Sequence, residues 1–335
     1  MEQNEHYYRK VIGSIGVSLL FFLLFINVFQ VVLTVFSFFL PENSVYGEVI
    51  YQSAYAIGYL ASFMAPVAIM RYLIGRNRYA FRPMYTTVRF PKIALLAIPL
   101  GVALVSSAAY INMSIVNIFG FDNIMDLLYE SESSLQPYQI VLQFITVCLV
   151  PGFCEEFLFR GAILTNCLPF GRTNAILISS LLFALMHQNP QQFFYAFVAG
   201  LLLGVLYEKS GSIWPGVLLH TINNFVSVAQ GIIASRMSDL IKSSVALTFM
   251  ELFILFFGIG AAILLLVRFF SQKRDFRGGV FGKSFPAADF YAEVPLSAKQ
   301  VRTLFWTPSM ITFVVICASE AVLLLGMAVL YGMVA

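Results

Sequence analysis

Long apolar runs follow one another along the chain, separated by short polar segments. A helix needs about 20 apolar residues to cross the hydrocarbon core of a bilayer, so each long run predicts a membrane span. The predicted spans lie at roughly 11–39, 50–72, 93–118, 137–160, 174–188, 191–207, 213–233, 247–268 and 308–334. The fifth and sixth runs are short and only Gln188, Asn189 and Pro190 separate them, so they also fit one tight helical hairpin. The pattern predicts an all-α polytopic membrane protein with eight or nine transmembrane helices.

Composition supports lipid as the solvent of this chain. Of its 335 residues, 59% are hydrophobic and 11% are charged, and 34 are phenylalanine. An average soluble domain carries about 25% charged residues. The first apolar run is too long for the hydrophobic region of a signal peptide and lacks a cleavage site flanked by small residues, so we expect it to be a span.

Lysine and arginine are distributed unevenly over the predicted loops. With nine spans and a cytoplasmic N-terminus, eighteen of the twenty basic residues fall on the cytoplasmic side, and only Arg236 and Lys242 fall on the other. Basic residues accumulate on the cytoplasmic side of membrane proteins, so this distribution predicts that orientation. We expect the plasma membrane of a bacterium as the location. No basic cluster is interleaved with aromatic residues, which argues against a nucleic-acid partner.

The chain divides into three parts by the positions of its polar motifs. N-terminal membrane helices are expected over 1–136, a four-helix catalytic membrane core over 137–233, and C-terminal membrane helices over 234–335. The segment at about 271–307 mixes glycine, proline, aromatic and charged residues, and we expect a cytoplasmic linker or a partly ordered flap there. The four cysteines show no C-x-x-C spacing, which favours small buried side chains over disulfides or a thiolate metal site.

The first polar motif within a span contains Glu155, Glu156 and Arg160. Ionisable groups within spans are costly and are commonly functional. Glu156 and Arg160 are spaced i, i+4 with the acid first, the favourable order for a helix ion pair. Glu155 points about 100° away around the helix and remains available as a base or a ligand. The alternative is a pair of interfacial acids with a snorkelling arginine.

Two further motifs place histidines in apolar helices. Phe183 and His187 share a helix face at i, i+4, so the ring can pack against the imidazole and orient it. His220 shares a face with Asn224, and Asn223 lies nearby. Polar groups facing lipid would be unsatisfied, so these side chains are expected to face a polar interior. A structurally satisfied histidine and a hydrogen-bonded contact between helices are the respective alternatives.

The three motifs together suit peptide hydrolysis. A glutamate can take a proton from water, while histidine and asparagine can donate to an oxyanion. Glu155, His187 and His220 would alternatively form a metal site with two histidines and one carboxylate. No H-E-x-x-H helix is present, which excludes ordinary zincin geometry. Glu155 and His220 fall at compatible depths, whereas a full-length fifth span would carry His187 toward the far side.

The ordered motifs E-E-x-x-x-R, F-x-x-x-H and H-x-x-x-N resemble the CPBP family, which comprises the CAAX prenyl endopeptidases of the Rce type and the bacterial Abi proteins. The resemblance covers about 150–230 and implies an intramembrane endopeptidase with a polar, conical cavity opening toward the cytoplasm. It implies that Glu155 and His187 activate water, that His220 and Asn224 stabilise the oxyanion, and that Glu156 and Arg160 support the site. No cofactor is required in this mechanism, with a divalent metal such as zinc as the alternative. The expected partners are the bilayer and a peptide or membrane-protein substrate, prenylated or not.

Other interpretations stay open at the sequence level. A non-proteolytic bacteriocin-immunity or scaffold protein of the same fold is one of them. A transporter is another, for which Glu320 in the last span is the suggestive residue, although Glu320 would also suit a hydrogen bond with Asn27 or with a backbone group. Ala196, Gly200 and Gly204 recur every four residues and predict a face for close helix packing rather than a chemical site.

Overall fold

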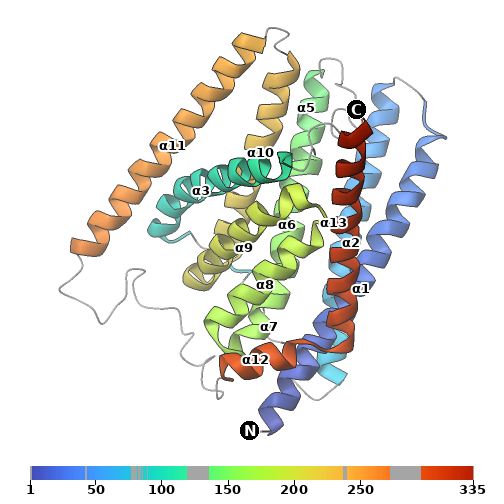
Figure 1. The fold of residues 1–335 in the computed structure, drawn as a ribbon, viewed down its shortest axis with the longest axis vertical. Coiled ribbons are helices and arrows are strands. Elements are labelled where there is room, and N and C mark those ends of the chain that lie inside the picture. Colours follow the sequence, from blue (N-terminus) through green and yellow to red (C-terminus); the bar gives the residue numbers. More distant parts are fainter. Residues whose placement is uncertain are drawn as a thin grey trace.

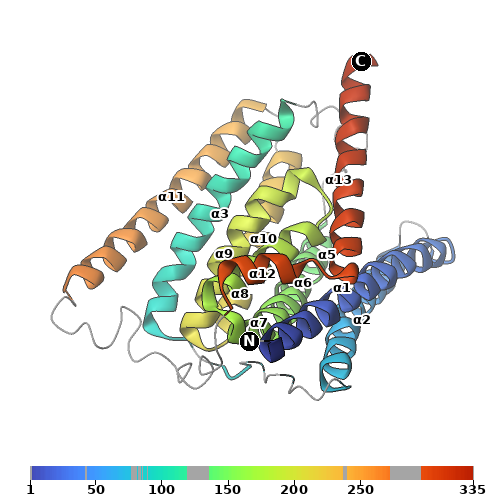
Figure 2. The ribbon, with the colours of Figure 1, turned by 60° about the horizontal axis from the view of Figure 1, so that its bottom comes forward.

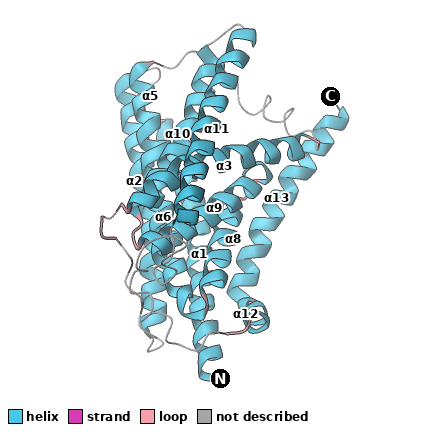
Figure 3. Cartoon of the chain, turned by 90° about the vertical axis from the view of Figure 1, so that its left-hand side faces the viewer, coloured by secondary structure: helices cyan, strands magenta, loops and turns pink. Residues whose placement is uncertain are grey.

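The computed structural model describes residues 2–41, 44–76, 81, 84, 86–88, 90–118, 136–236, 240–271 and 296–334. Within these ranges the regular secondary structure is helical, and no strand occurs (Figure 3). The elements are α1 (Glu2–Ser37), α2 (Val45–Arg76), α3 (Lys92–Asn117), α5 (Pro137–Gln143), η1 (Phe144–Leu149), α6 (Val150–Glu156), η2 (Phe157–Leu164), α7 (Thr165–Cys167), η3 (Leu168–Phe170), α8 (Arg172–Met186), α9 (Pro190–Ser210), α10 (Trp214–Arg236), α11 (Leu240–Ser271), α12 (Ala298–Phe305) and α13 (Pro308–Val334).

In the described part of the chain, eight helices are long and apolar enough to cross a membrane. The prediction of an all-α polytopic membrane protein is therefore confirmed. The continuous stretch from α5 to η3 counts as one of these eight, and α8 is a shorter apolar helix. With 15 residues, α8 extends only about 22 Å, whereas the hydrocarbon core is about 30 Å thick. The fifth predicted run is therefore too short to be a full span.

A tight turn joins α8 to α9, and the two helices pack against each other as a hairpin. The side chain of Asn189 accepts a hydrogen bond from the backbone N–H of Gln191, and Pro190 occupies the first helical position of α9. Both features are favoured at a helix start, because the first N–H groups have no partner within the helix. The hairpin interpretation of the fifth and sixth runs thus describes this region.

The helices that carry the motifs lie between two outer helix pairs. Figures 1 and 2 show α3 and α11 on one side of the core formed by α6, α8, α9 and α10, with α1 and α2 on the other. Direct packing joins α3 to α9 and α10, and α2 to α6, while α13 packs along α1. Large apolar side chains on α11, such as Phe253 and Phe256, are exposed, as expected for a surface that contacts lipid.

The fourth span is not a uniform α-helix. Two π-helical segments, η1 and η2, lie on either side of α6, the element that carries Glu155 and Glu156. π-helical turns inside α-helices occur frequently at functional sites. Pro151 has no N–H, so the carbonyl of Val147 lacks its usual α-helical donor. That carbonyl instead accepts a hydrogen bond from Asn224 of α10.

Small residues bring α8 and α9 together. A Cβ on Gly200 would lie 2.9 Å from the Cα of Ser180, closer than real Cβ contacts allow. A Cβ on Gly204 would lie 3.1 Å from Ile176. Ala196 on the same face is 1% exposed. The predicted close-packing face is confirmed.

Most of the segment at about 271–307 lies outside the described residues. Its described end includes the short helix α12, which begins after Ser297 with a capping box. In the described part of the chain, Glu320 makes no hydrogen bond to Asn27, and the Asn27 amide donates to the carbonyl of Leu23 on its own helix.

Candidate functional site

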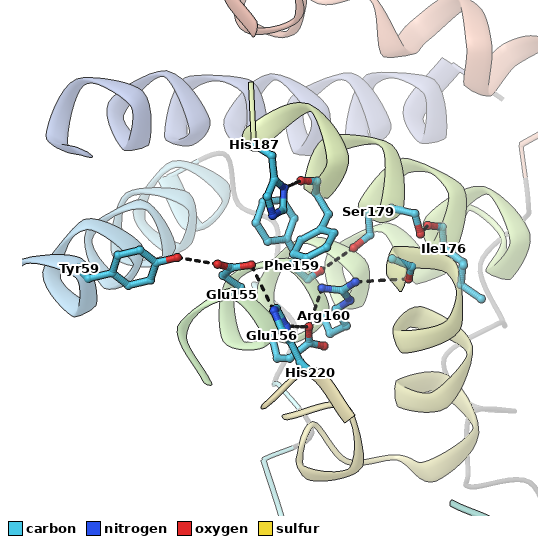
Figure 4. A network of polar contacts seen from close by, with 12 residues as sticks. Tyr59, Glu155, Glu156, Phe159, Arg160, Ile176, Ser179, His187 and His220 are labelled. Atoms are coloured by element: carbon cyan, nitrogen blue, oxygen red, sulfur yellow. Dashed lines mark hydrogen bonds and ion pairs between the residues drawn. The ribbon is translucent and has the colours of Figure 1, made fainter. Parts of the chain in front are cut away.

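The three polar motifs converge on one cavity of about 470 Å³ between α2, α3, α6, α8, α9 and α10. Among the residues that line it are Glu155, His187, His220, Asn223 and Asn224. Glu156 and Arg160 lie beneath this lining and are 1% and 0% exposed. Figure 4 shows the side chains of Glu155, His187 and His220 close together.

The short helix α8 explains how His187 reaches the depth of Glu155. Gly171, with φ of +116°, makes the turn between the fourth span and α8. Glu155 precedes this glycine by sixteen residues, and His187 follows it by sixteen. Two antiparallel helices that leave one turn place residues equally distant from it at similar depths. The full-length fifth span, which would have separated the two residues, is absent.

Glu156 is the anchored member of the acid pair. Its Oε1 accepts hydrogen bonds from Nη1 of Arg160 at 2.7 Å and from Nδ1 of His220 at 3.1 Å. The predicted i, i+4 ion pair with Arg160 is therefore confirmed. Buried charges persist in proteins when they are paired and hydrogen-bonded, as this pair is.

Arg160 is held on two further sides. Its Nη2 donates to the carbonyl of Gly200 at 3.3 Å, and its guanidinium carbon lies 4.4 Å from the centre of the Phe183 ring. A cation over an aromatic face is attracted by the ring quadrupole. The Arg160 side chain therefore joins the fourth span to α8 and α9 underneath the cavity.

Phe183 lies against both histidines. Its ring makes edge-to-face contacts with His187, at 5.0 Å between ring centres, and with His220, at 5.8 Å. The predicted packing of Phe183 on His187 is confirmed. Nδ1 of His187 lies 2.8 Å from the carbonyl oxygen of Phe183. A carbonyl oxygen only accepts, so Nδ1 carries the proton, and the neutral ring keeps a lone pair on Nε2.

Glu155 has surroundings different from those of Glu156. Its Oε1 accepts a hydrogen bond from the Tyr59 hydroxyl at 2.5 Å, and its Oε2 lies 3.7 Å from Nε2 of His220. Oε2 accepts no hydrogen bond from the described residues. One carboxylate oxygen is thus fixed by a neutral donor, and the other is able to take a proton.

Tyr59 and two glycines are site residues that the sequence analysis missed. Tyr51, Tyr55 and Tyr59 recur every four residues in the apolar helix α2, and this repeated hydroxyl was the available signal. Gly216 borders Glu156, because a Cβ there would lie 3.0 Å from Glu156 Oε2. Gly200 supplies the carbonyl that accepts from Arg160. Neither glycine carries a side chain that sequence chemistry could have singled out.

Asn224 and Asn223 occupy the α10 wall of the cavity. The Nδ2 of Asn224 donates to the carbonyl of Val147 at 3.0 Å. An amide nitrogen has two hydrogens, so Asn224 keeps a second donor. Asn223 lines this cavity and also a second, smaller chamber that adjoins it between α3, α9, α10 and α11.

The hydrogen bonds of the two histidines engage one ring nitrogen each. Nδ1 of His220 is bound by Glu156, and Nδ1 of His187 by a backbone carbonyl. Histidines that bind a metal or a water through Nε2 commonly make the same contact through Nδ1. Among the described residues, no group of three histidine, cysteine, aspartate or glutamate side chains is arranged to hold a metal ion.

The cavity extends toward one end of the helix bundle. Its lining runs from Glu155 and His220 to Val147, Gln192 and Val228, near the ends where α5 and α9 begin and α10 finishes. On the other side of Glu155, residues 158–170 are all buried. The basic residues Arg172 and Lys209 lie at that closed end. A cavity that opens to the cytoplasm would therefore require these basic helix ends to lie on the non-cytoplasmic side of the membrane.

Comparison with known proteins found a match to the central part of the chain. A family model described as Type II CAAX prenyl endopeptidase Rce1-like matches residues 136–226. The matched residues include all three motifs, whereas α1, α2, α3, α11, α12 and α13 lie outside the match. A search of curated proteins and a search of solved structures found no match.

Proposed function

We propose that this protein, whose residues 136–226 match the model of the Rce1-like type II CAAX prenyl endopeptidases, uses Glu155 to activate the water that cleaves a peptide bond. The match to a protease family and the eight apolar helices long enough to cross a membrane support intramembrane proteolysis as the general function. The observation that carries the finer proposal is the convergence of Glu155, His187 and His220 on one cavity.

Glu155 and His187 are the proposed pair for water. Oε2 of Glu155 takes a proton from the water, while Tyr59 holds Oε1 in place. The lone pair on Nε2 of His187 accepts the second hydrogen of the same water and orients its oxygen. The water O–H bond breaks as the new C–O bond forms at the substrate carbonyl.

His220 and Asn224 are the proposed donors to the oxyanion. Nδ1 of His220 faces a carboxylate and carries a proton, so Nε2 donates when the ring is an imidazolium. The second amide hydrogen of Asn224 supplies another hydrogen bond. Donors fixed in advance around a developing negative charge lower the barrier, because they need no reorganisation.

The intermediate collapses with the proton held by Glu155. The C–N bond breaks, Glu155 returns its proton to the departing amine, and the products are a carboxyl end and an amino end. Glu156 and Arg160 take no part in proton transfer. They keep His220 in position, since Oε1 of Glu156 binds both side chains. The cycle needs no cofactor.

The proposed orientation follows from the charges of the chain. With the basic ends of the helices in the cytoplasm, as positive residues favour, the cavity opens toward the opposite face of the bilayer. The substrate is a peptide or a segment of a membrane protein that enters the cavity from that half of the bilayer. This direction differs from the cytoplasmic opening that the resemblance implied.

A cleavage assay with purified full-length protein tests the proposal. Glu155→Gln and His220→Ala should each lower the cleavage rate by about 10²–10⁴-fold, the usual contribution of a general base or of an oxyanion donor. The control is Glu320→Gln on α13. Glu320 is also an acid within a span, but it lines neither the cavity nor the second chamber next to the cavity. Wild-type activity in both site variants would overturn the roles proposed for Glu155 and His220. Absence of cleavage by the wild type would favour the non-proteolytic alternative.

A chelator added to the wild-type reaction separates the two mechanisms. Activity should be unchanged, because Glu155 and His187 activate the water directly. Inhibition that added zinc reverses would overturn the glutamate mechanism while leaving proteolysis in place.

A further inference from the structure

A second chamber of about 350 Å³ continues from the cavity between α3, α9, α10 and α11. The two spaces share wall residues, including Gln192, Tyr195 and Asn223. Both α3 and α11 lie outside the part of the chain that matches the family model. The chamber is therefore built partly from helices that the family model does not cover.

Polar side chains line part of this chamber, and apolar side chains such as Val226 and Leu247 line the rest. The polar side chains include the amides and hydroxyls of Gln191, Gln192, Asn223, Gln230, Ser106 and Ser227. The Nε2 of Gln191 is buried and has no hydrogen-bond partner among the described residues. Unpartnered polar groups at membrane depth are costly, so a chamber of this composition suits a polar occupant.

The walls of the chamber are fixed to each other. Asn112 of α3, which is 3% exposed, donates to the carbonyl of Gln191 at 2.5 Å. Its side-chain oxygen accepts from the backbone N–H of Phe194 at 3.1 Å. These bonds bind α3 to the first turn of α9, where N–H groups lack helical partners. The amides of Gln191 and Gln192 are therefore presented by a rigid joint between two helices.

One carboxylate, Glu251, is hydrogen-bonded to two residues that line the chamber. Gln230 donates to Oε1 of Glu251 at 2.5 Å, and the hydroxyl of Tyr110 also hydrogen-bonds to Glu251. Glu251 is half-buried within α11, and no ion pair of the described residues includes it. A carboxylate with neutral donors only, inside a membrane protein, favours the approach of a cation.

Cleavage imposes a requirement that this chamber meets. Water can attack a peptide bond only where the substrate is extended, and an extended segment has backbone N–H and C=O groups that lipid leaves unsatisfied. Side-chain amides both donate and accept, as backbone amides do. We propose that the chamber is a substrate subsite, which binds an extended polypeptide segment next to the scissile bond and directs a basic side chain of that segment at Glu251. This inference rests on the proposed proteolytic function.

A peptide mixture provides the test. Purified full-length protein in detergent is incubated with synthetic peptides that differ only by Lys, Gln or Glu at each position in turn, and products are identified by mass spectrometry. The wild type should cleave best with Lys at one fixed distance from the cut bond, by about tenfold over Gln. Glu251→Gln should abolish this preference and keep cleavage of the Gln peptides. The matched control Glu320→Gln should retain the preference.

A second variant tests the role of the side-chain amides of the chamber independently of Glu251. Gln191→Leu removes the side-chain amide of a residue that lines the chamber but not the catalytic cavity, so KM should rise by up to about tenfold at unchanged kcat. Cleavage without any preference for Lys, or an unchanged preference in Glu251→Gln, would overturn the subsite and leave the protease assignment intact. Failure of the wild type to cleave any peptide would overturn both.

Discussion

At the scale of single residues, Tyr59 offers the most direct test of how Glu155 is positioned. Its hydroxyl is the only described donor to the Glu155 carboxylate within hydrogen-bond distance. Tyr59→Phe should lower kcat by about tenfold, since a hydrogen bond to a charged group contributes about 1.5–3 kcal/mol and part of it holds the base in its reactive orientation. KM should stay near the wild-type value, whereas the unfolding temperature should fall, because a buried carboxylate oxygen loses its donor.

The control for Tyr59 lies one turn away on α2. The ring centre of Tyr55 lies 5.8 Å from that of Tyr59, but its hydroxyl makes no described hydrogen bond to Glu155. Tyr55→Phe should therefore keep full kcat. Equal losses in the two variants would show that aromatic packing, rather than the hydrogen bond, is what matters.

Arg160 is expected to matter for stability as well as for catalysis. Arg160→Met would leave Glu156 buried with His220 as its remaining partner. Breaking a buried ion pair by removing one partner costs about 3–5 kcal/mol. The unfolding temperature in detergent should fall markedly and cleavage should be lost. Arg172→Met is the comparison, because Arg172 is 40% exposed in its pair with Glu208 and such a pair contributes about 0–1 kcal/mol.

At the scale of elements, α10 contains two glycines, and we expect opposite effects when each is replaced by alanine. A Cβ on Gly216 would lie 3.0 Å from Oε2 of Glu156, whereas a Cβ on Gly231 would meet nothing within 4 Å. Gly216→Ala should displace the carboxylate that positions His220 and lower cleavage by about tenfold, as small misplacements of catalytic groups do. Gly231→Ala should keep cleavage and raise the unfolding temperature, since alanine favours helix by about 1 kcal/mol. Similar cleavage in both variants would contradict the assigned role of Glu156.

The elements also show where sequence reasoning succeeded and where it stopped. Hydropathy located the long spans, because their length follows from bilayer thickness. It overextended α8, because apolar composition does not reveal that the chain turns back at His187 before crossing. The π-helical turns of η1 and η2 were also out of reach, since they depend on packing against other helices and not on a residue pattern.

The site divides in the same way between local and distant contacts. Glu156 with Arg160, and Phe183 with His187, are pairs within one helix and follow from its geometry. The contact of Glu155 with Tyr59 spans 96 positions of the chain and arises only when α2 packs against α6. Contacts of this kind require the fold, so sequence analysis found the chemical groups but not all of their partners.

At the scale of the whole molecule, the cavity mouth lies at the end of the helical core opposite Arg172 and Lys209, which makes the orientation testable. Ser227 is exposed on the cavity wall, and Lys299 is exposed on α12, which packs against the first helix near the N-terminus. The native cysteines are all buried, so each new cysteine reports alone. On intact cells, an impermeant maleimide should label Ser227→Cys and should label Lys299→Cys only after the membrane is permeabilised.

Ser227 and Lys299 are expected on opposite sides of the membrane in either orientation of the chain. On intact cells, therefore, only one of the two cysteine variants should be labelled. With the basic ends in the cytoplasm, the potential and the anionic lipids of that face stabilise them, and water and substrate reach Glu155 from the opposite face. Labelling of Lys299→Cys on intact cells, with Ser227→Cys protected, would place the cavity mouth in the cytoplasm. The eighteen basic residues of one side would then lie outside, against the charge rule, and the cytoplasmic opening implied by the family resemblance would hold. The labelling therefore decides which half of the bilayer the substrate must come from.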